Sequence, residues 1–197
     1  MNEYLTKLGV PPKVQAFFAL GEPVFYFGDE VEYFSEAVHY IPPTHNLWMA
    51  GSFFARQIIL TFSAMEAVSF LTLNQADYLD FDDLLFLSFG VRISADQLNW
   101  VRSNLRGREF TLAFGNDLMG RLADIKAATA IRNRMVRLSY HEGNVTAWLK
   151  EKKICFEGEK LSLSSFEKAF GIRTRIRTCK PPSQLTFLDQ LKYDTPR

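Results

Sequence analysis

Cysteine and histidine are scarce in this sequence, which limits the metal and nucleophile chemistry that it can offer. The chain has two cysteines and three histidines among 197 residues. Cys155 and Cys179 form no CxxC motif and have no clustered histidines beside them, so neither a zinc site nor a disulfide framework is indicated. We expect both to be small core residues. His39, His45 and His141 lie in unrelated segments, with no acid or nucleophile at a motif spacing.

The sequence also lacks long apolar runs, repeats and low-complexity tracts. No segment approaches the roughly 18 uninterrupted apolar residues that a membrane-spanning helix requires. The first residues, MNEYLTKLGV, show no cationic flank followed by an apolar stretch, as a secretory signal would. We therefore expect a soluble cytoplasmic protein with no membrane partner.

Apolar residues are abundant, whereas basic residues are scarce in the first half of the chain. Hydrophobic residues make up 47% of the sequence and include 18 phenylalanines, which excludes disorder and favours a well-packed α/β or α+β domain. Residues 1–100 contain 4 Lys/Arg against 12 Asp/Glu, a net charge of −8, whereas residues 101–197 contain 19 against 10, a net charge of +9. This division predicts either a polarised surface through which two copies or two subdomains meet, or a basic face for nucleic-acid phosphates.

Three apolar runs predict buried strands, and an amphipathic helical segment follows each of them. Ser63 and Ser94 are placed to cap the first two helices. Strands that alternate with helices predict a mostly parallel sheet with right-handed crossovers, in which ligands lie outside the carboxyl ends of the strands. The three strands are expected at residues 57–62, 84–89 and 109–114.

The flanking segments predict smaller units around this α/β core. Two short helices and a β-hairpin are expected before residue 42, and a loop at residues 42–51. After Arg134 the apolar period changes to two, which predicts a β-meander and then a short helix from Ser164 or Ser165. Residues 172–177 alternate Ile and Arg and predict a fourth strand of the sheet, before a last short helix. The expected regions are a lead-in (1–56), the core (57–135), a meander insertion (136–171) and a closing strand and helix of the core (172–197).

Two segments carry motifs at the ends of the first and third expected strands. IILTFSAMEAVSFL is similar to a motif in which a strand ends in Glu and small residues ahead of a helix, and TLAFGNDLMGRLAD is similar to a later motif, Asp-x-Asp-x-x-Gly. Over residues 58–133 the chain thus resembles the Toprim family, the α/β catalytic domain shared by topoisomerases, DNA primases and some nucleases. The matching or nearly matching positions are Ser63, Glu66, Ala67 and Ser69 in the first motif and Asn116, Asp117 and Gly120 in the second.

The departures from this family concern its catalytic acids. The family's catalytic Glu falls on Phe62, and the first Asp of its pair falls on Gly115, so that Asp117 alone remains. The family's chemistry requires several carboxylates converging on Mg²⁺, and a phenyl ring neither ligates a metal nor carries a proton. The resemblance therefore implies a Toprim frame with a degenerate active site and no cofactor.

The remaining acids leave alternatives open. Asp117 is either the N-cap of the helix that begins at Leu118 or a weak metal ligand. Glu66 lies one turn along its helix from Phe62, and we expect it to be a solvated or Arg-paired surface carboxylate. An active Mg²⁺-dependent nuclease or primase would have to use Asp117, Glu66 and Asp124 in a rearranged site.

Arginines of the second half are the candidates for binding. Arg173, Arg175 and Arg177 fall on one face of the fourth expected strand because of its period of two. Guanidinium groups on one face repel one another unless anions lie between them, and either a phosphate backbone or the acidic half could supply those anions. The other candidates are Arg102, Arg106 and Arg108, followed by Arg121, Lys126, Arg132, Arg134 and Arg137.

Three classes of function are consistent with these observations. The first is a catalytically inactive, primase-related protein that binds nucleic acid, or a replication or mobilisation protein, through its basic half. The second is an active Mg²⁺-dependent enzyme, and the third is a protein-interaction module that forms homo-oligomers through its acidic and basic halves. The salt dependence of binding distinguishes the first class from the third, and metal titration distinguishes the first from the second.

Overall fold

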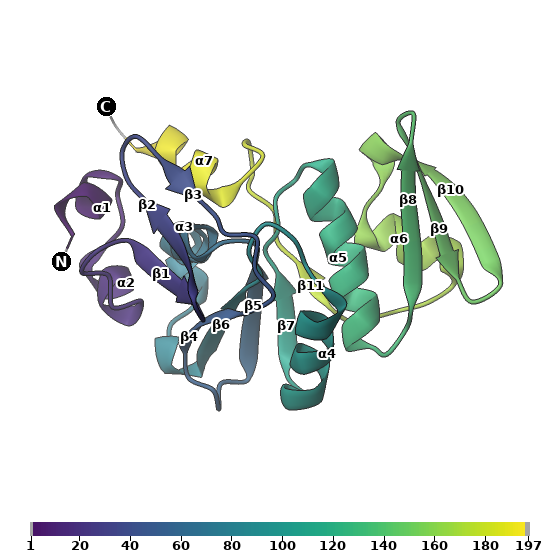
Figure 1. Cartoon of the computed structure of the whole chain (residues 1–197), viewed down its shortest axis with the longest axis horizontal. Coiled ribbons are helices and arrows are strands. Elements are labelled where there is room, and N and C mark those ends of the chain that lie inside the picture. Colours follow the sequence, from purple (N-terminus) through teal and green to yellow (C-terminus); the bar gives the residue numbers. More distant parts are fainter. Residues whose placement is uncertain (1, 196–197) are drawn as a thin grey trace.

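A five-stranded sheet forms the centre of the protein, in the strand order β11-β7-β5-β6-β4 (Figure 1). The computed structural model describes residues 2–195. Strands β5, β6, β7 and β11 are parallel, and β4 pairs antiparallel with β6 at one edge. The prediction of an α/β fold with a mostly parallel sheet is confirmed. The strands are β4 (Trp48–Gly51), β5 (Gln57–Thr61), β6 (Leu84–Ser88), β7 (Glu109–Leu112) and β11 (Arg177–Thr178).

A helix follows each of the three central strands, as the sequence predicts. These helices are α3 (Ala64–Asn74), α4 (Ala95–Asn104) and α5 (Leu118–Ile131). Each begins at a side chain that accepts a backbone N–H of the first turn: Ser63, Ser94 and Asp117. Because capping satisfies donors that have no partner within the helix, these local signals fix where each helix begins.

Helices cover both faces of the sheet, so that the core has two parts. Helices α3 and α7 (Phe187–Asp194) pack on one face together with the lead-in, around residues such as Ile59 and Phe86. Helices α4 and α5 pack on the other face, around residues such as Ile58 and Leu60. The alternation of neighbouring residues between the two cores explains why residues 58–60 of β5 and 84–87 of β6 are all apolar, as expected of strands buried on both faces.

The lead-in consists of two short helices and a small antiparallel sheet, β1-β2-β3. The predicted helices and hairpin are confirmed. The expectation that residues 42–51 form only a loop is wrong, because β4 lies within them and joins the core sheet. The elements are α1 (Glu3–Lys7), α2 (Pro12–Phe17), β1 (Val24–Phe27), β2 (Glu30–Phe34) and β3 (His39–Tyr40).

The predicted β-meander is also present and stands beside α5 as a separate three-stranded sheet (Figure 1). It consists of β8 (Val136–His141), β9 (Asn144–Leu149) and β10 (Lys152–Glu157), followed by α6 (Leu163–Phe170). Helix α6 begins one or two residues earlier than expected, because Ser162 and Ser165 form a capping box. Short 3-10 turns lie at Gln75–Asp77 (η1), Phe81–Asp83 (η2) and Gly158–Lys160 (η3).

The predicted fourth strand is much shorter than its sequence pattern indicates. Only Arg177 and Thr178 pair with β7. Arg175 has a φ of 56°, outside the β region, and Glu167 of α6 accepts hydrogen bonds from the backbone N and Oγ1 of Thr174 at 2.6 and 2.5 Å. These contacts hold the segment against α6 instead of the sheet, so the three arginines do not share one strand face.

Two further expectations can be compared with the structure. The expectation that both cysteines are core residues is wrong for Cys155, which is exposed, whereas Cys179 is partly buried and packs against the core. Within residues 2–195, none of the helices is long and apolar enough to cross a membrane.

Candidate functional site

The two Toprim-like motifs meet at the carboxyl end of the central sheet. Strands β5 and β7 are parallel neighbours, with Leu60 opposite Leu112. Phe62 follows β5 directly, and Gly115 lies three residues after β7. The prediction that these positions lie at the carboxyl ends of strands in one sheet is confirmed.

Phenyl rings fill the position at which the resemblance predicts acids. The ring centroids of Phe62 and Phe114 are 4.8 Å apart, and those of Phe89 and Phe114 are 6.2 Å apart. Phe89 and Phe114 are fully buried. Three strands are therefore followed by phenyl rings that form one cluster, and this cluster offers no oxygen ligand and no titratable group.

The loop before α7 crosses this end of the sheet. The backbone N of Asn116 donates to the carbonyl of Leu185 at 2.7 Å. A Cβ atom at Gly115 would lie 2.9 Å from that carbonyl oxygen, and one at Gly120 would lie 1.9 Å from the carbonyl oxygen of Gly115. Gly120 is thus required for the close approach of α5 to the turn, whereas a larger residue at position 115 would displace the loop.

A lysine side chain occupies the end of β7. The Nζ atom of Lys180 lies 2.7 Å from Oδ2 of Asp124 and donates to the carbonyls of Phe114 at 3.1 Å and Gly115 at 2.9 Å. Burial raises the pKa of Asp124 to about 6, although the neighbouring Lys180 opposes the shift. This end of the sheet therefore already contains a cation that belongs to the chain itself.

The three acids that an active enzyme would need are engaged separately. Asp117 is exposed and accepts the N–H of Gly120 at 2.8 Å, as the capping prediction states. The expectation that Glu66 is a surface carboxylate is wrong: its side chain is buried and caps α7 (Phe187–Asp194). Asp124 pairs with Lys180. Among residues 2–195, no group of three His, Cys, Asp or Glu side chains is arranged to hold a metal ion.

Most candidate arginines lie at the opposite, amino end of the sheet, whereas Arg121 lies in the first turn of α5 and donates to the carbonyls of Asn116, Gly158 and Glu159. Arg102 and Arg106 line a groove of about 380 Å³ together with Arg132, which we call the amino-end groove. Arg102 donates to the side chain of Asn133, and Arg132 donates to the carbonyl of Thr174 at 2.6 Å. Because α5 has 14 residues and runs from one end of the sheet to the other, the arginines and the aromatic cluster are about 20 Å apart.

The remaining candidates differ in how far they are already engaged. Arg108 donates to the carbonyls of Phe53 and Ala55, and its guanidinium lies 5.7 Å from the Phe53 ring centroid. Arg173 and Arg175 are exposed on either side of Thr174, the residue that Arg132 contacts. Arg177 is exposed in β11. Arg173 and Arg175 are thus the sequence neighbours of a residue that Arg132 of the amino-end groove contacts, and Arg108 has a structural contact.

The acidic and basic halves of the chain do not pair with each other. Six ion pairs are present among the described residues, and both members of every pair fall within 1–100 or within 101–197. Two examples are Arg56 with Asp83 and Lys180 with Asp124. Ion pairs between the acids of residues 1–100 and the bases of residues 101–197, which the uneven charge distribution allowed, are therefore absent from residues 2–195.

A second groove combines the candidates Arg134 and Arg137 with residues that the sequence did not identify. It lies where α5 ends and β8 begins, has a volume of about 1130 Å³, and shares Asn133 with the amino-end groove. We call it the meander groove. The period of two after Arg134 predicted the β-meander, but not that its residues would line a groove with Phe170 of α6. Its basic and aromatic lining consists of Arg134, Arg137, Lys150, Lys152, Trp148 and Phe170, with Glu151 as the acid.

Comparisons with known proteins do not assign this chain to a family. No family model, no curated protein and no solved structure matches it.

Proposed function

We propose that this protein is a catalytically inactive, Toprim-like and primase-related protein that binds nucleic acid through the basic amino end of its sheet. The Toprim relationship rests on the two motifs and on their meeting at the ends of parallel neighbours, β5 and β7. The resemblance to primases is also what suggests a replication or mobilisation protein as a partner.

The absence of ion pairs between the halves is the observation that carries the binding proposal. Arg102, Arg106 and Arg132 converge on one groove, and none of them pairs with a carboxylate among residues 2–195. Clustered guanidinium groups repel one another, and phosphates relieve this repulsion by forming charge-assisted hydrogen bonds. Binding at the amino end of the sheet is also consistent with the carboxyl end, where phenyl rings and the loop before α7 cover the strand ends and leave no acidic site.

Salt dependence is the direct test of this proposal. We expect the wild-type protein to bind duplex DNA of mixed sequence weakly at low salt, with log affinity falling linearly with log salt concentration. Arg102→Gln combined with Arg106→Gln should reduce the slope by about 0.9 for each lost phosphate contact. Arg173→Gln, Arg175→Gln and Arg177→Gln should act in the same direction. Fluorescence anisotropy of labelled DNA measures these slopes.

Arg92→Gln is the matched control, because Arg92 is an exposed arginine in the loop after β6, at the carboxyl end of the sheet. It removes the same charge and should leave the slope unchanged. No binding by the wild-type protein at low salt would contradict the proposal. Concentration-dependent self-association under the same conditions would then favour the interaction module.

A further inference from the structure

The meander groove combines unpaired cations with aromatic rings. Arg134, Arg137, Lys150 and Lys152 line it, and none of them forms an ion pair within residues 2–195. The Nη1 atom of Arg134 is buried and has no hydrogen-bond partner among the described residues. A buried N–H without an acceptor is costly, and a shift of the Arg134 side chain toward an anion in the groove would supply that acceptor. The groove is therefore suited to a negatively charged ligand.

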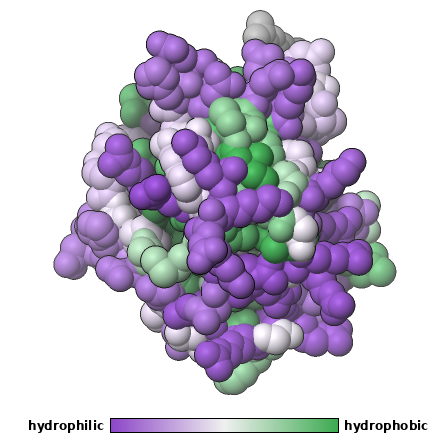
Figure 2. All heavy atoms as spheres, turned by 90° about the vertical axis from the view of Figure 1, so that its right-hand side faces the viewer, coloured by the Kyte–Doolittle hydropathy of each residue, from purple (hydrophilic) through white to green (hydrophobic). Residues whose placement is uncertain are grey.

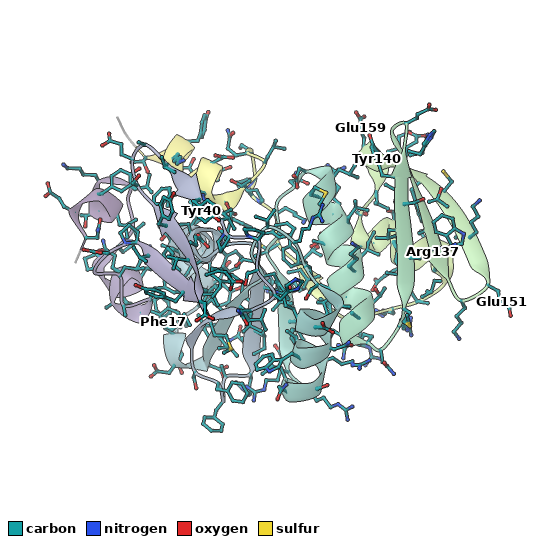
Figure 3. The ribbon with its side chains drawn as sticks, viewed as in Figure 1. Phe17, Tyr40, Arg137, Tyr140, Glu151 and Glu159 are labelled. Atoms are coloured by element: carbon teal, nitrogen blue, oxygen red, sulfur yellow. The ribbon has the colours of Figure 1, made fainter. Side chains whose placement is uncertain are left out.

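The outward face of the meander places charge on both sides of a tryptophan. Arg137 and Lys153 are the cross-strand neighbours of Trp148 in β8 and β10. The Arg137 guanidinium lies 4.3 Å and the Lys153 ammonium 5.5 Å from the Trp148 ring centroid. Figure 3 shows Arg137 on this sheet and Glu151 at the outer tip of the turn between β9 and β10. The acid of the groove thus lies at its margin.

A second aromatic residue, Phe170, also lines the meander groove. Phe170 ends α6, and the Nζ of Lys152 lies 5.7 Å from its ring centroid while donating to the carbonyl of Ala169 at 2.6 Å. Seen from this side, hydrophilic side chains surround an apolar area of the surface (Figure 2). Met135, also in the groove lining, is 93% exposed.

We propose that the meander groove binds single-stranded nucleic acid, with phosphates on its basic side chains and a base stacked on Trp148. This inference rests on the proposed function and extends it to the type of nucleic acid. Stacking a base on an aromatic ring strengthens binding by roughly 5- to 100-fold, against about 2- to 5-fold for an exposed cation–π contact, so a base can displace one of the two cations. The displaced cation then remains beside the ring to bind a phosphate.

A single strand fits this arrangement better than a duplex or an acidic peptide. In a duplex the base faces are covered by their neighbours, whereas a single strand exposes them. Cations on both sides of one aromatic ring match the order phosphate, base, phosphate along a nucleic-acid strand. Asn133 lines both grooves, so the amino-end groove, where further phosphates would bind, adjoins the meander groove.

Tryptophan fluorescence and affinity together test this inference on the full chain. We expect oligo(dT) of about 12 nucleotides to quench the wild-type emission and to bind more tightly than the matching duplex. Trp148→Phe should remove most of the quenching while retaining most of the affinity. Trp148→Ala should weaken oligo(dT) binding roughly 5- to 100-fold and leave duplex binding unchanged. Phe170→Leu is a second, milder variant, and Lys168→Gln, an exposed lysine of α6 outside the groove lining, is the charge control.

The outcomes separate this inference from the proposed function. Failure to bind either nucleic acid at low salt would overturn both. Duplex binding with a normal salt slope, but no preference for oligo(dT) and no effect of Trp148→Ala or Phe170→Leu, would overturn the single-strand inference alone. If a glutamate-rich peptide of the same length quenches the tryptophan fluorescence equally, the single-strand inference is overturned and an acidic peptide becomes the inferred ligand. Thermal unfolding of each variant shows whether it is folded. If Trp148→Ala is not folded, the single-strand inference is tested by the effect of Phe170→Leu and by the preference of the wild-type protein for oligo(dT) over duplex.

Discussion

The carboxylate of Glu66 accepts hydrogen bonds from the backbone N–H groups of Phe187 at 2.9 Å and Leu188 at 3.2 Å, across 121 and 122 residues of sequence. It thereby caps helix α7 and joins the end of the chain to the helix that follows β5. Glu32 acts similarly from the lead-in, accepting the N–H groups of Ala64 and Met65 at 2.8 and 2.9 Å. Both termini of the fold are thus attached to the core through buried carboxylates at helix N-termini.

Loss of the Glu66 carboxylate should destabilise the protein. Glu66→Ala leaves the first N–H groups of α7 buried without acceptors, and we expect the free energy of unfolding to fall by about 1–3 kcal/mol. Glu66→Gln keeps one acceptor oxygen and should have a smaller effect. Urea unfolding measures the difference, with the exposed Glu3→Ala as the control. A Glu66→Ala protein as stable as wild type would show that α7 does not depend on this cap.

Asp124 should make stability depend on pH between about 4 and 6. Burial raises its pKa from 3.8 to about 6, so the folded state binds the proton more tightly than the unfolded state. The associated stability is fully present below pH 4 and is lost as the pH rises through 6, by about 1.36 kcal/mol per unit of pKa shift, or about 3 kcal/mol in total.

Asp124→Asn removes this titration. The difference in unfolding free energy between wild type and Asp124→Asn should therefore change across pH 4–6 and be flat from pH 6.5 to 8. Buried Glu66, whose pKa is also raised by burial, contributes in the same direction to both proteins and cancels in the difference. A difference that stays constant from pH 4 to 7 would contradict the buried, raised-pKa carboxyl.

Gly120→Ala should be among the most damaging small substitutions in the chain. The added Cβ would lie 1.9 Å from the carbonyl oxygen of Gly115, so α5 or the turn before it must move. We expect a loss of about 3 kcal/mol or more. Gly21→Ala is the matched control, because a Cβ there meets nothing within 4 Å, and it should change stability by less than about 0.5 kcal/mol. Thermal unfolding compares the two, and similar midpoints would disprove the close approach.

Restoring the acids tests the Toprim resemblance. Phe62→Glu with Gly115→Asp would place carboxylates beside Asp117, and we expect this double variant to bind Mg²⁺ or Mn²⁺ measurably by calorimetry while wild type gives no heat. Without metal it should be less stable than wild type, because the acids repel one another and the side chain at position 115 displaces the Leu185 loop. Added metal should recover stability according to its affinity for the folded state.

Phe62→Leu with Gly115→Ala is the control for that experiment, since it disturbs the same packing without adding charge. It should be destabilised and should not respond to metal. Tight Mg²⁺ binding by the wild-type chain that is abolished by Asp117→Asn would instead support an active enzyme.

The central elements could be predicted from the sequence because their determinants are local. Apolar runs such as LLFLS of β6, and the caps at Ser63, Ser94 and Asp117, act within one strand or one helical turn. The same locality misled the prediction for residues 172–177. Their alternation is that of a strand, but Glu167 binds Thr174 and Arg175 leaves the β region, so only two residues pair. Strand β4 was missed because its partner, β6, lies more than thirty residues away.

The sequence alone determined that no acids stand at the two positions where the Toprim resemblance expects them, because Phe62 and Gly115 are identities that no fold can alter. The contacts that the remaining acids make were decided by the tertiary structure. Glu66 was buried by the packing of α7, and Lys180 was brought to Asp124 by a loop that crosses the end of β7. The position of the arginines was decided in the same way: α4 and α5 both run back toward the amino end of the sheet, so their last residues gather there. Contacts between residues far apart in sequence depend on how whole elements pack, and no local period contains that information.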